Sequence, residues 1–454
     1  MRTNRRRRYF ISSAILIVAI AAAMILTGLI QPSHAAAGDV FATFLDSGEI
    51  VSGRPVVSLI VPSGKYAIFA KINIDQDAGH VGDKFVSVSC TLLPAKVVDT
   101  NMIRLQPSSE KYLDNGTMPF QVVADLTSNT QIDLTCTFPA ILSSKVSFRF
   151  AKITAIRFGG SLCEKPSPAK CSDPASDVFA TFKKSGSIVS NTPIVKLSVP
   201  EGKYAIFAKI NIDQDDKYRF ASPVCTLEAG TDLDRNVIRL QQSGEMRLDN
   251  TALPFQAVEE FRTEWVDPVP FDPPLHDIRL SCRFTTGDSH VLSFRFAKIM
   301  AIKLDGSVCK KPSPAVCRDV ASDVYATFKE SGPIVSNDPI VKLNVPAGLY
   351  AVSAKINLDQ DDTKKGVTAV CTLRADLDVD RNVIRLQHSG VAVDNATIPL
   401  QLVQILPSQG GIEMFCKFDP FESSLLSFRF AKITAIRVRG NRCEKASPAN
   451  CLAP

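Results

Sequence analysis

Hydrophobic and polar residues alternate with a period of two along most of the chain beyond its first 37 residues. Val57, Leu59 and Val61 occupy every second position of one such stretch. Between residues 132 and 138, Ile, Leu, Cys and Phe alternate with Asp and Thr. Alternation over about five to nine residues, bounded by Gly, Pro, Asn and Asp, is typical of strands that bury one face. Beyond the N-terminal segment we find no helical period, so the pattern predicts an all-β protein.

This pattern occurs three times along the chain. The string Asp-Val-Phe-Ala-Thr-Phe of residues 39–44 recurs at residues 177–182 and, with Tyr replacing the first Phe, at residues 323–328. Further strings that begin at residues 64, 101 and 147 recur in the same order in both later copies. Each copy is far longer than a solenoid repeat and holds about eight or nine predicted strands, so each copy is a whole domain.

Strands at these intervals predict an antiparallel sandwich of two sheets, jelly-roll or immunoglobulin-like. We therefore expect three tandem antiparallel β-sandwich (jelly-roll-like) domains that follow an N-terminal apolar helix. The expected boundaries are 1–37 for the N-terminal segment and 38–175, 176–321 and 322–454 for modules 1, 2 and 3.

Twelve cysteines, four at matching places in each copy, indicate an oxidising compartment. The alternation places Cys90 and Cys136 on the apolar faces of two strands, which suggests a buried bridge within or between the sheets. On the chain-entropy model such a bridge contributes about 4 kcal/mol. The expected core pairs are Cys90 with Cys136, Cys225 with Cys282, and Cys371 with Cys416.

A second pair of cysteines closes a short proline-containing segment at the end of each copy. Metal ligation is the alternative, but no histidine or second close cysteine pair accompanies these residues, so a disulfide is favoured. The expected pairs are Cys163 with Cys171, Cys309 with Cys317, and Cys443 with Cys451.

The N-terminus resembles a targeting segment. Five arginines precede an apolar stretch at residues 10–30, and small residues follow at 35–37. These are the three parts of a signal peptide, although the apolar stretch is also long enough for an uncleaved membrane anchor. Cleavage is favoured, and in both cases the body of the protein is expected to be extracellular or in the cell envelope.

The formal net charge of +6 comes mainly from this segment. Without its five arginines, 47 of the 52 basic residues remain against 46 acidic ones. The body of the protein is therefore almost neutral, and binding to nucleic acid is not expected.

One recurring polar string has oxygen ligands at alternate positions, as in some calcium sites. It lacks the glycine and the glutamate of an EF-hand-like loop, so we favour a strand with a polar outward face that ends in an acidic turn. The calcium candidates are Asn73, Asp75, Asp77, Asn211, Asp213, Asp215, Asn357, Asp359 and Asp361.

Three other features are interpreted as structural or as contact surfaces. The Asp-Arg-Asn strings at residues 234–236 and 380–382 predict turns that lead into strands. The Phe-Arg-Phe segments around Arg149, Arg295 and Arg429 are candidates for a binding strip, although a late strand with a solvated face is favoured. An insertion in the second copy contains Trp265, Phe271 and several prolines. It is a candidate contact loop, although a tolerated surface insertion is favoured.

The string of residues 64–72 resembles the Gly-x-Tyr strand of the complement and tumour-necrosis-factor jelly rolls, and residues 148–156 are similar to their closing strand. The repeat unit is also similar to secreted bacterial β-sandwich modules. The resemblance to these jelly rolls implies a fold used for binding and for trimer formation. This chain has no collagen-like stalk, so the hypothesis that follows is an intrachain pseudo-trimer.

No histidine recurs in all three copies, and the cysteines are assigned to disulfides, so no catalytic residues are expected. We expect an exported, non-enzymatic binding or structural protein with an unknown extracellular ligand or surface as its partner. The alternatives are a secreted enzyme that acts on carbohydrate and a calcium-dependent adhesin. No cofactor is expected except calcium under the last alternative, and membrane contact only through an uncleaved N-terminal segment.

Overall fold

The computed structural model describes most of the chain beyond residue 38. The described residues are 39–76, 86–95, 97–105, 115–138, 146–214, 221–240, 250–262, 274–284, 292–360, 367–386, 395–418 and 426–452. The N-terminal segment, for which the sequence predicts a helix, lies outside these residues. Within them, we find no helix with the length and apolar character needed to cross a membrane.

Within the described residues each module has eight strands, followed by a short tail of two more. Module 1 comprises β1 (Val40–Glu49), β2 (Pro55–Val61), β3 (Gly64–Gln76), β4 (Val86–Pro94), β5 (Asp99–Leu105), β6 (Asn115–Leu126), β7 (Thr130–Thr137) and β8 (Val146–Phe158). Module 2 comprises β11 (Ser176–Ser187), β12 (Pro193–Val199), β13 (Gly202–Gln214), β14 (Val224–Ala229), β15 (Asp232–Val237), β16 (Asn250–Phe261), β17 (His276–Arg283) and β18 (Leu292–Leu304). Module 3 comprises β21 (Ser322–Pro333), β22 (Pro339–Val345), β23 (Gly348–Gln360), β24 (Val367–Ala375), β25 (Asp378–Leu386), β26 (Asn395–Leu406), β27 (Gly410–Lys417) and β28 (Leu426–Val438). The tails are β9 (Ser161–Pro166) with β10 (Ala169–Lys170), β19 (Ser307–Pro312) with β20 (Ala315–Val316), and β29 (Arg442–Ala446) with β30 (Ala449–Asn450).

The strand order within a module is that of a jelly roll. In module 1 one sheet has the order β1-β8-β3-β6 and the other has β2-β7-β4-β5, and modules 2 and 3 repeat this arrangement. Two nested Greek keys give this order. The sequence prediction of tandem antiparallel β-sandwiches is therefore confirmed for the described residues. We call the β1-type sheet the inner sheet and the β2-type sheet the outer sheet.

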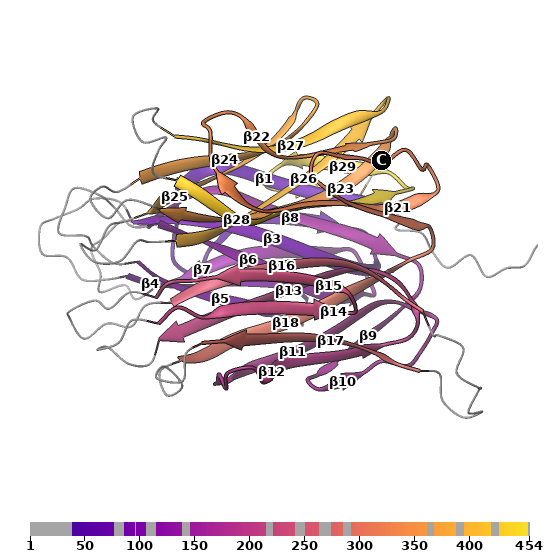
Figure 1. The fold of residues 1–454 in the computed structure, drawn as a ribbon, viewed down its shortest axis with the longest axis horizontal. Coiled ribbons are helices and arrows are strands. Elements are labelled where there is room, and N and C mark those ends of the chain that lie inside the picture. Colours follow the sequence, from indigo (N-terminus) through magenta and orange to yellow (C-terminus); the bar gives the residue numbers. More distant parts are fainter. Residues whose placement is uncertain are drawn as a thin grey trace, which may run out of the picture.

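Each tail adds a strand to both sheets of the following module. Tail strand β9 pairs in parallel with β11 of the inner sheet, and β10 pairs in parallel with β12 of the outer sheet. The tail of module 2 pairs with module 3 in the same way. The tail of module 3 returns to β1 and β2 of module 1, so the three modules form a closed ring. The paired strands β29 and β1 lie close together in Figure 1.

The described residues form four apolar cores. Three of them lie between the two sheets of a module. The fourth is made by the inner sheets of all three modules together, and includes Val40 and Ile156 from module 1, Phe207 and Met300 from module 2, and Val403 from module 3. Because this core is shared, the modules are joined by apolar packing as well as by the chain.

The inner and outer sheets have different surroundings. Along β7, in the outer sheet, Ile132, Leu134 and Cys136 are buried while their neighbours are partly or fully exposed, as the alternation predicts. Along β3, in the inner sheet, nearly every side chain is buried, including Lys71 and Asn73 at 0% exposure. The interpretation of this strand as half-buried, with a solvated polar face, is therefore wrong, because the preceding module in the ring covers that face.

The six disulfides are of two kinds. Cys90 and Cys136 are direct partners on the adjacent antiparallel strands β4 and β7, so this bridge lies within the outer sheet, and the other two modules have the same bridge. The second kind closes the tails, where Cys163 is joined to Cys171 and the other two tails match. Because β9 and β10 belong to different sheets, each tail bridge links the two sheets that the tail extends.

A β-bulge in the last strand of each module changes the direction of its side chains. The pairing of β3 with β8 shifts between Lys71 and Asn73, and Phe150 has a left-handed φ of 52°. Phe296 and Phe430 have the same φ in the other modules. Side chains three positions apart on a regular strand point to opposite faces of the sheet. This bulge instead puts Arg149 and Lys152 on the same face, the one that points away from the module's own core.

Candidate functional site

The polar strings that recur in the sequence meet where one module packs against the next. At each such place the fifth strand of one module (β5, β15 or β25) and its tail lie against the inner sheet of the following module. We call these places junctions 1–2, 2–3 and 3–1, after the two modules that they join.

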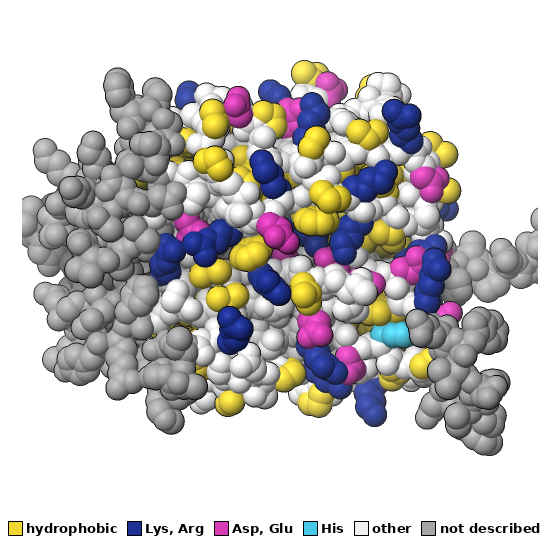
Figure 2. Space-filling model, viewed as in Figure 1, with side chains coloured by type: hydrophobic (Ala, Val, Ile, Leu, Met, Phe, Trp, Pro, Cys, Tyr) yellow, Lys and Arg dark blue, Asp and Glu magenta, His cyan; other side chains and the backbone are white. Residues whose placement is uncertain are grey.

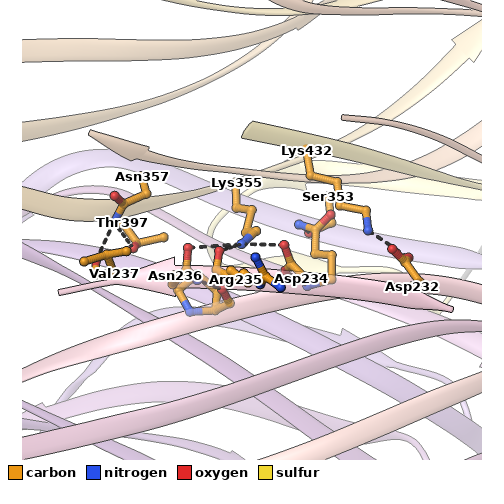
Figure 3. Close-up of polar contacts among 12 residues, drawn as sticks. Asp232, Asp234, Arg235, Asn236, Val237, Ser353, Lys355, Asn357, Thr397 and Lys432 are labelled. Carbon is orange, nitrogen blue, oxygen red and sulfur yellow. Dashed lines mark hydrogen bonds and ion pairs between the residues drawn. The ribbon is translucent and has the colours of Figure 1, made fainter. Parts of the chain in front are cut away.

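A fully buried lysine anchors each junction. At junction 2–3, Lys355 Nζ lies 2.8 Å from Asp234 Oδ1 and donates to the Arg235 carbonyl and to Asn236 Oδ1, both at 3.0 Å (Figure 3). Lys209 pairs with Asp99 at 2.8 Å across junction 1–2, and Lys71 pairs with Asp380 at 2.9 Å across junction 3–1. A buried ammonium group requires such partners, because burial without them is very unfavourable.

Burial lowers the pKa of Lys71, Lys209 and Lys355, and the paired aspartate acts in the opposite direction. Each aspartate is held in place by its own module. Asp234 Oδ2, for example, accepts a hydrogen bond of 2.7 Å from the Gln256 backbone N–H. The aspartate of one module therefore opposes the effect of burial on the lysine of the next module.

An asparagine two residues further along each inner strand binds the neighbouring backbone. Asn357 Nδ2 donates to the Val237 carbonyl at 2.9 Å, Asn211 Nδ2 to the Met102 carbonyl at 2.7 Å, and Asn73 Nδ2 to the Val383 carbonyl at 2.7 Å. Repetition in all three junctions shows that these asparagines fix the position of one module on the next.

The described calcium candidates are part of the same contacts. Asp75 is 1% exposed and lies 2.7 Å from Arg149 Nε of its own module and 3.2 Å from Arg385 Nη1 of module 3. Asp213 and Asp359 have the matching pairs of arginines. Two guanidinium groups thus lie where a cation would have to approach. Asp77, Asp215 and Asp361 are outside the described residues, so calcium binding stays a prediction.

Two interpretations of recurring strings are corrected by these contacts. The Asp-Arg-Asn strings are not turns but lie within strands β15 and β25, where they bind the buried lysines. The last strand of each module does not have a fully solvated face, because Lys152, Lys298 and Lys432 are buried to 5% exposure or less. Lys152 Nζ lies 2.7 Å from Glu444 Oε1 of the docked tail.

A groove of about 1100 Å³ opens at junction 3–1. Module 1 contributes residues of β1 and β8, and module 3 contributes the start of β25 and the tail strand β29. Side chains at the groove include Phe44, Asp46, Glu49, Arg149, Lys152, Leu377, Asp378, Arg381, Arg442 and Glu444. The site therefore exists only while modules 3 and 1 are in contact.

Most charges of the groove already have partners. Arg442 Nη2 lies 2.6 Å from Glu444 Oε2 and 3.5 Å from Asp378 Oδ2. Burial raises the pKa of the Asp378 carboxyl, although Lys152 and Arg442 oppose this effect. By contrast, Leu377 at the rim is 90% exposed, and Phe44 is 38% exposed. The groove thus offers apolar surface beside charges that are nearly balanced.

The predicted contact loop is not part of the described chain, because Trp265 and Phe271 both lie outside it. Phe261 and His276, which lie before and after this segment in the sequence, stack with ring centroids 4.9 Å apart. In the described ranges, three or more His, Cys, Asp or Glu side chains are nowhere grouped as a metal would require.

The sequence had not identified Lys71, Lys209 and Lys355 as functional residues. The signal was present, because a lysine precedes each recurring asparagine by two residues. It was misinterpreted because a lysine between apolar residues of a strand normally faces solvent.

Comparison with known proteins gives little further information. No protein-family model matches the chain, and no curated protein matches it. Solved structures with some likeness include the triple jelly roll of an archaeal virus turret, at 11% identity, covering 90% of this chain and 92% of that one, with a TM-score of 0.16. The CBM22-1–CBM22-2 tandem domain of Paenibacillus barcinonensis Xyn10C has 8% identity, 57% and 91% coverage and a TM-score of 0.18. PNGF-II has 8% identity, 82% and 99% coverage and a TM-score of 0.23. Likenesses at such TM-scores carry no argument about this chain.

Proposed function

We propose that the protein is an exported, non-enzymatic binding protein that holds a polar extracellular ligand in the groove at junction 3–1. The observation that carries the proposal is that the groove is built from two modules that the closed ring brings together. The described residues of the recurring polar strings make contacts between modules at the junctions. Six disulfides fit a protein that works in an oxidising compartment.

The character of the groove favours a neutral polar ligand such as an oligosaccharide. Its acidic and basic side chains are nearly balanced in number, and several are paired with each other. Exposed apolar carbon at Phe44 and Leu377 can contact the less polar face of such a ligand. On the described part of the face shown in Figure 2, basic, acidic and apolar side chains are interspersed, without a basic stripe that would favour phosphate groups.

The proposal is tested by screening the protein against an oligosaccharide array and then repeating the screen with Asp46→Lys. Asp46 is exposed at the groove, and Glu330 stands at the equivalent position of module 3, away from it. Glu330→Lys is therefore a matched control with the same change of charge. We expect Asp46→Lys to weaken binding of any array ligand by about tenfold and Glu330→Lys to leave it unchanged. Equal effects of the two variants, or no bound oligosaccharide, would contradict the proposal.

A further inference from the structure

The three junctions have the same backbone pairing but different charges beside the docked tail. Val178 pairs with Leu162, Val324 with Val308, and Val40 with Arg442, in the same parallel register. Hydrogen bonds between backbones therefore cannot distinguish one tail from another. Any preference of a module for its own tail must come from side chains.

Beside each tail lies a lysine from the last strand of the receiving module. Its carboxylate partner is a tail glutamate at junctions 1–2 and 3–1 but an aspartate of strand β15 at junction 2–3. At junction 1–2, Lys298 Nζ lies 2.8 Å from Glu164 Oε1 of the tail. At junction 2–3, Lys432 Nζ lies 2.9 Å from Asp232 Oδ2 of strand β15, as Figure 3 shows.

The reason for the difference is the residue at the tail position. Where the other tails have Glu164 and Glu444, the tail of module 2 has Lys310, whose Nζ lies 2.9 Å from Asp232 Oδ1. One aspartate thus holds two ammonium groups. Asp232 is only 5% exposed, so both partners are held in partly desolvated surroundings.

The residue at the position equivalent to Asp232 differs between the modules, and it varies together with the tail residue at the position of Lys310. In module 1 the equivalent residue is Val97, and that junction has the tail glutamate Glu164. In module 3 it is Asp378, and there the tail has both Glu444 and Arg442, which balance each other. In each junction the lysine of the last strand (Lys152, Lys298 or Lys432) has at least one carboxylate partner. The tail that has lysine at the position of Lys310 comes from the module that has Asp232.

We propose that the tail residue at the position of Lys310 and the residue at the position of Asp232 form a matched pair, and that this pair makes each junction specific for its own tail. Module 3 accepts Lys310 beside its own Lys432 only because Asp232, on strand β15 of module 2, pairs with both ammonium groups. A tail with lysine at the position of Glu164 would face Lys298 at junction 1–2 with Val97 in place of Asp232, because Asp99 of the fifth strand already pairs with Lys209. The cost of leaving a charge unpaired in a partly buried site rejects such docking, whether the tail comes from another module or from a second copy of the chain.

The proposal is tested by a double-mutant cycle at junction 2–3 in the full protein with its disulfides intact. Asp232→Asn keeps the shape of the side chain but leaves Lys310 and Lys432 without a carboxylate. We expect the equilibrium constant for folding, measured by urea denaturation, to fall by a factor on the order of 100. Adding Lys310→Glu reproduces the arrangement of Lys298 with Glu164, and we expect it to recover at least tenfold of that loss.

Lys310→Glu alone is the control, because Lys432 then has two carboxylates and the loss is expected to be less than tenfold. The proposal fails if Asp232→Asn has no effect, or if Lys310→Glu does not reduce that effect. If Asp232→Asn alone gives no folded protein, recovery of folded monomer in the double variant supports the proposal, and failure of both variants overturns it. Light scattering after size-exclusion chromatography measures the monomer in each case.

Discussion

The outer and inner sheets of a module have the same number of strands and a similar alternation of apolar and polar residues. They differ in what covers the face that points away from the module's own core. The outer sheet buries one face in its own module and leaves much of the other in water, as β7 shows. The inner sheet buries both faces, and the second face contains apolar residues near the axis and lysine, asparagine and aspartate at the junctions. The comparison teaches that a polar strand face can be interior when a neighbour supplies a partner for every charge.

The largest expected effect comes from breaking an inner-sheet ion pair. Asp234→Ala leaves Lys355 fully buried without its carboxylate, and we expect the free energy of unfolding to fall by about 3–5 kcal/mol. Urea denaturation measures the loss. Replacing both partners, with Asp234→Leu and Lys355→Met, removes the charges together and is expected to cost much less. A double variant that is as unstable as Asp234→Ala would contradict this account of the junction.

Removing a disulfide of the outer sheet is expected to cost nearly as much. Cys90→Ala together with Cys136→Ala opens a loop with a sequence separation of 46 residues, and the chain-entropy model gives a loss of about 4 kcal/mol. The tail pair Cys163 and Cys171, with a separation of 8, should contribute about 2.5 kcal/mol on the same model. Thermal unfolding of the two double variants compares them, and a larger loss at the tail would show that docking, rather than loop entropy, sets its contribution.

Acid is expected to weaken junction 3–1 through Glu444. Burial alone would raise the pKa of this carboxyl, but Lys152 and Arg442 outweigh it and the pKa is lowered. The stabilisation is therefore present above the pKa of the unfolded chain, near 4.3, and is lost as the pH falls through the lower native value. Asp378, whose pKa burial raises, acts in the opposite direction.

Glu444→Gln tests this pH dependence. We expect the substitution to cost about 2 kcal/mol at pH 7 and to flatten the decrease of stability below about pH 5. Glu330→Gln, on an exposed part of β21, is the control. Parallel stability curves for the wild type and Glu444→Gln would show that this carboxylate does not carry the acid sensitivity.

The smallest effect is expected on the solvent face of an outer sheet. Asp277 lies 2.7 Å from Lys196 Nζ, and both side chains are partly exposed. Burial would raise the pKa of Asp277, but hydrogen bonds from Lys196, Ser198 and Arg279 lower it to about 2. Because solvent screens such pairs, Asp277→Asn should cost less than about 1 kcal/mol at pH 7. A loss as large as that of Asp234→Ala would remove the distinction between the two sheets.

Much of the fold could be predicted from the sequence because its signals are local. Alternation identifies strands such as β2 and β7, and the repeated strings divide the chain into three copies. The inward direction of Cys90 and Cys136 also follows from alternation, whereas their place opposite each other within one sheet does not. The bulge at Phe150 could not be predicted, since a single extra residue in a strand leaves no mark on the apolar pattern, and it reverses the direction of Lys152.

The candidate site was less predictable, because its residues are far apart in the chain. Lys71 and Asp380 belong to modules 1 and 3, and nothing in either string indicates that they meet. The groove depends on the same contact between the first and last modules. The polar strings recur as a contact surface must, but recurrence alone does not distinguish a contact between modules from a ligand site.

The sequence by itself determined the β-sandwich class, the three copies and the two kinds of cysteine pair, because these depend on periodicity and spacing along the chain. Only the tertiary structure decided that each tail pairs with the following module and that the last tail returns to the first. It also decided that lysine and aspartate on an apparently solvated strand face are interior. The physical reason is that burial depends on what covers a face, and here the cover comes from another copy of the same unit.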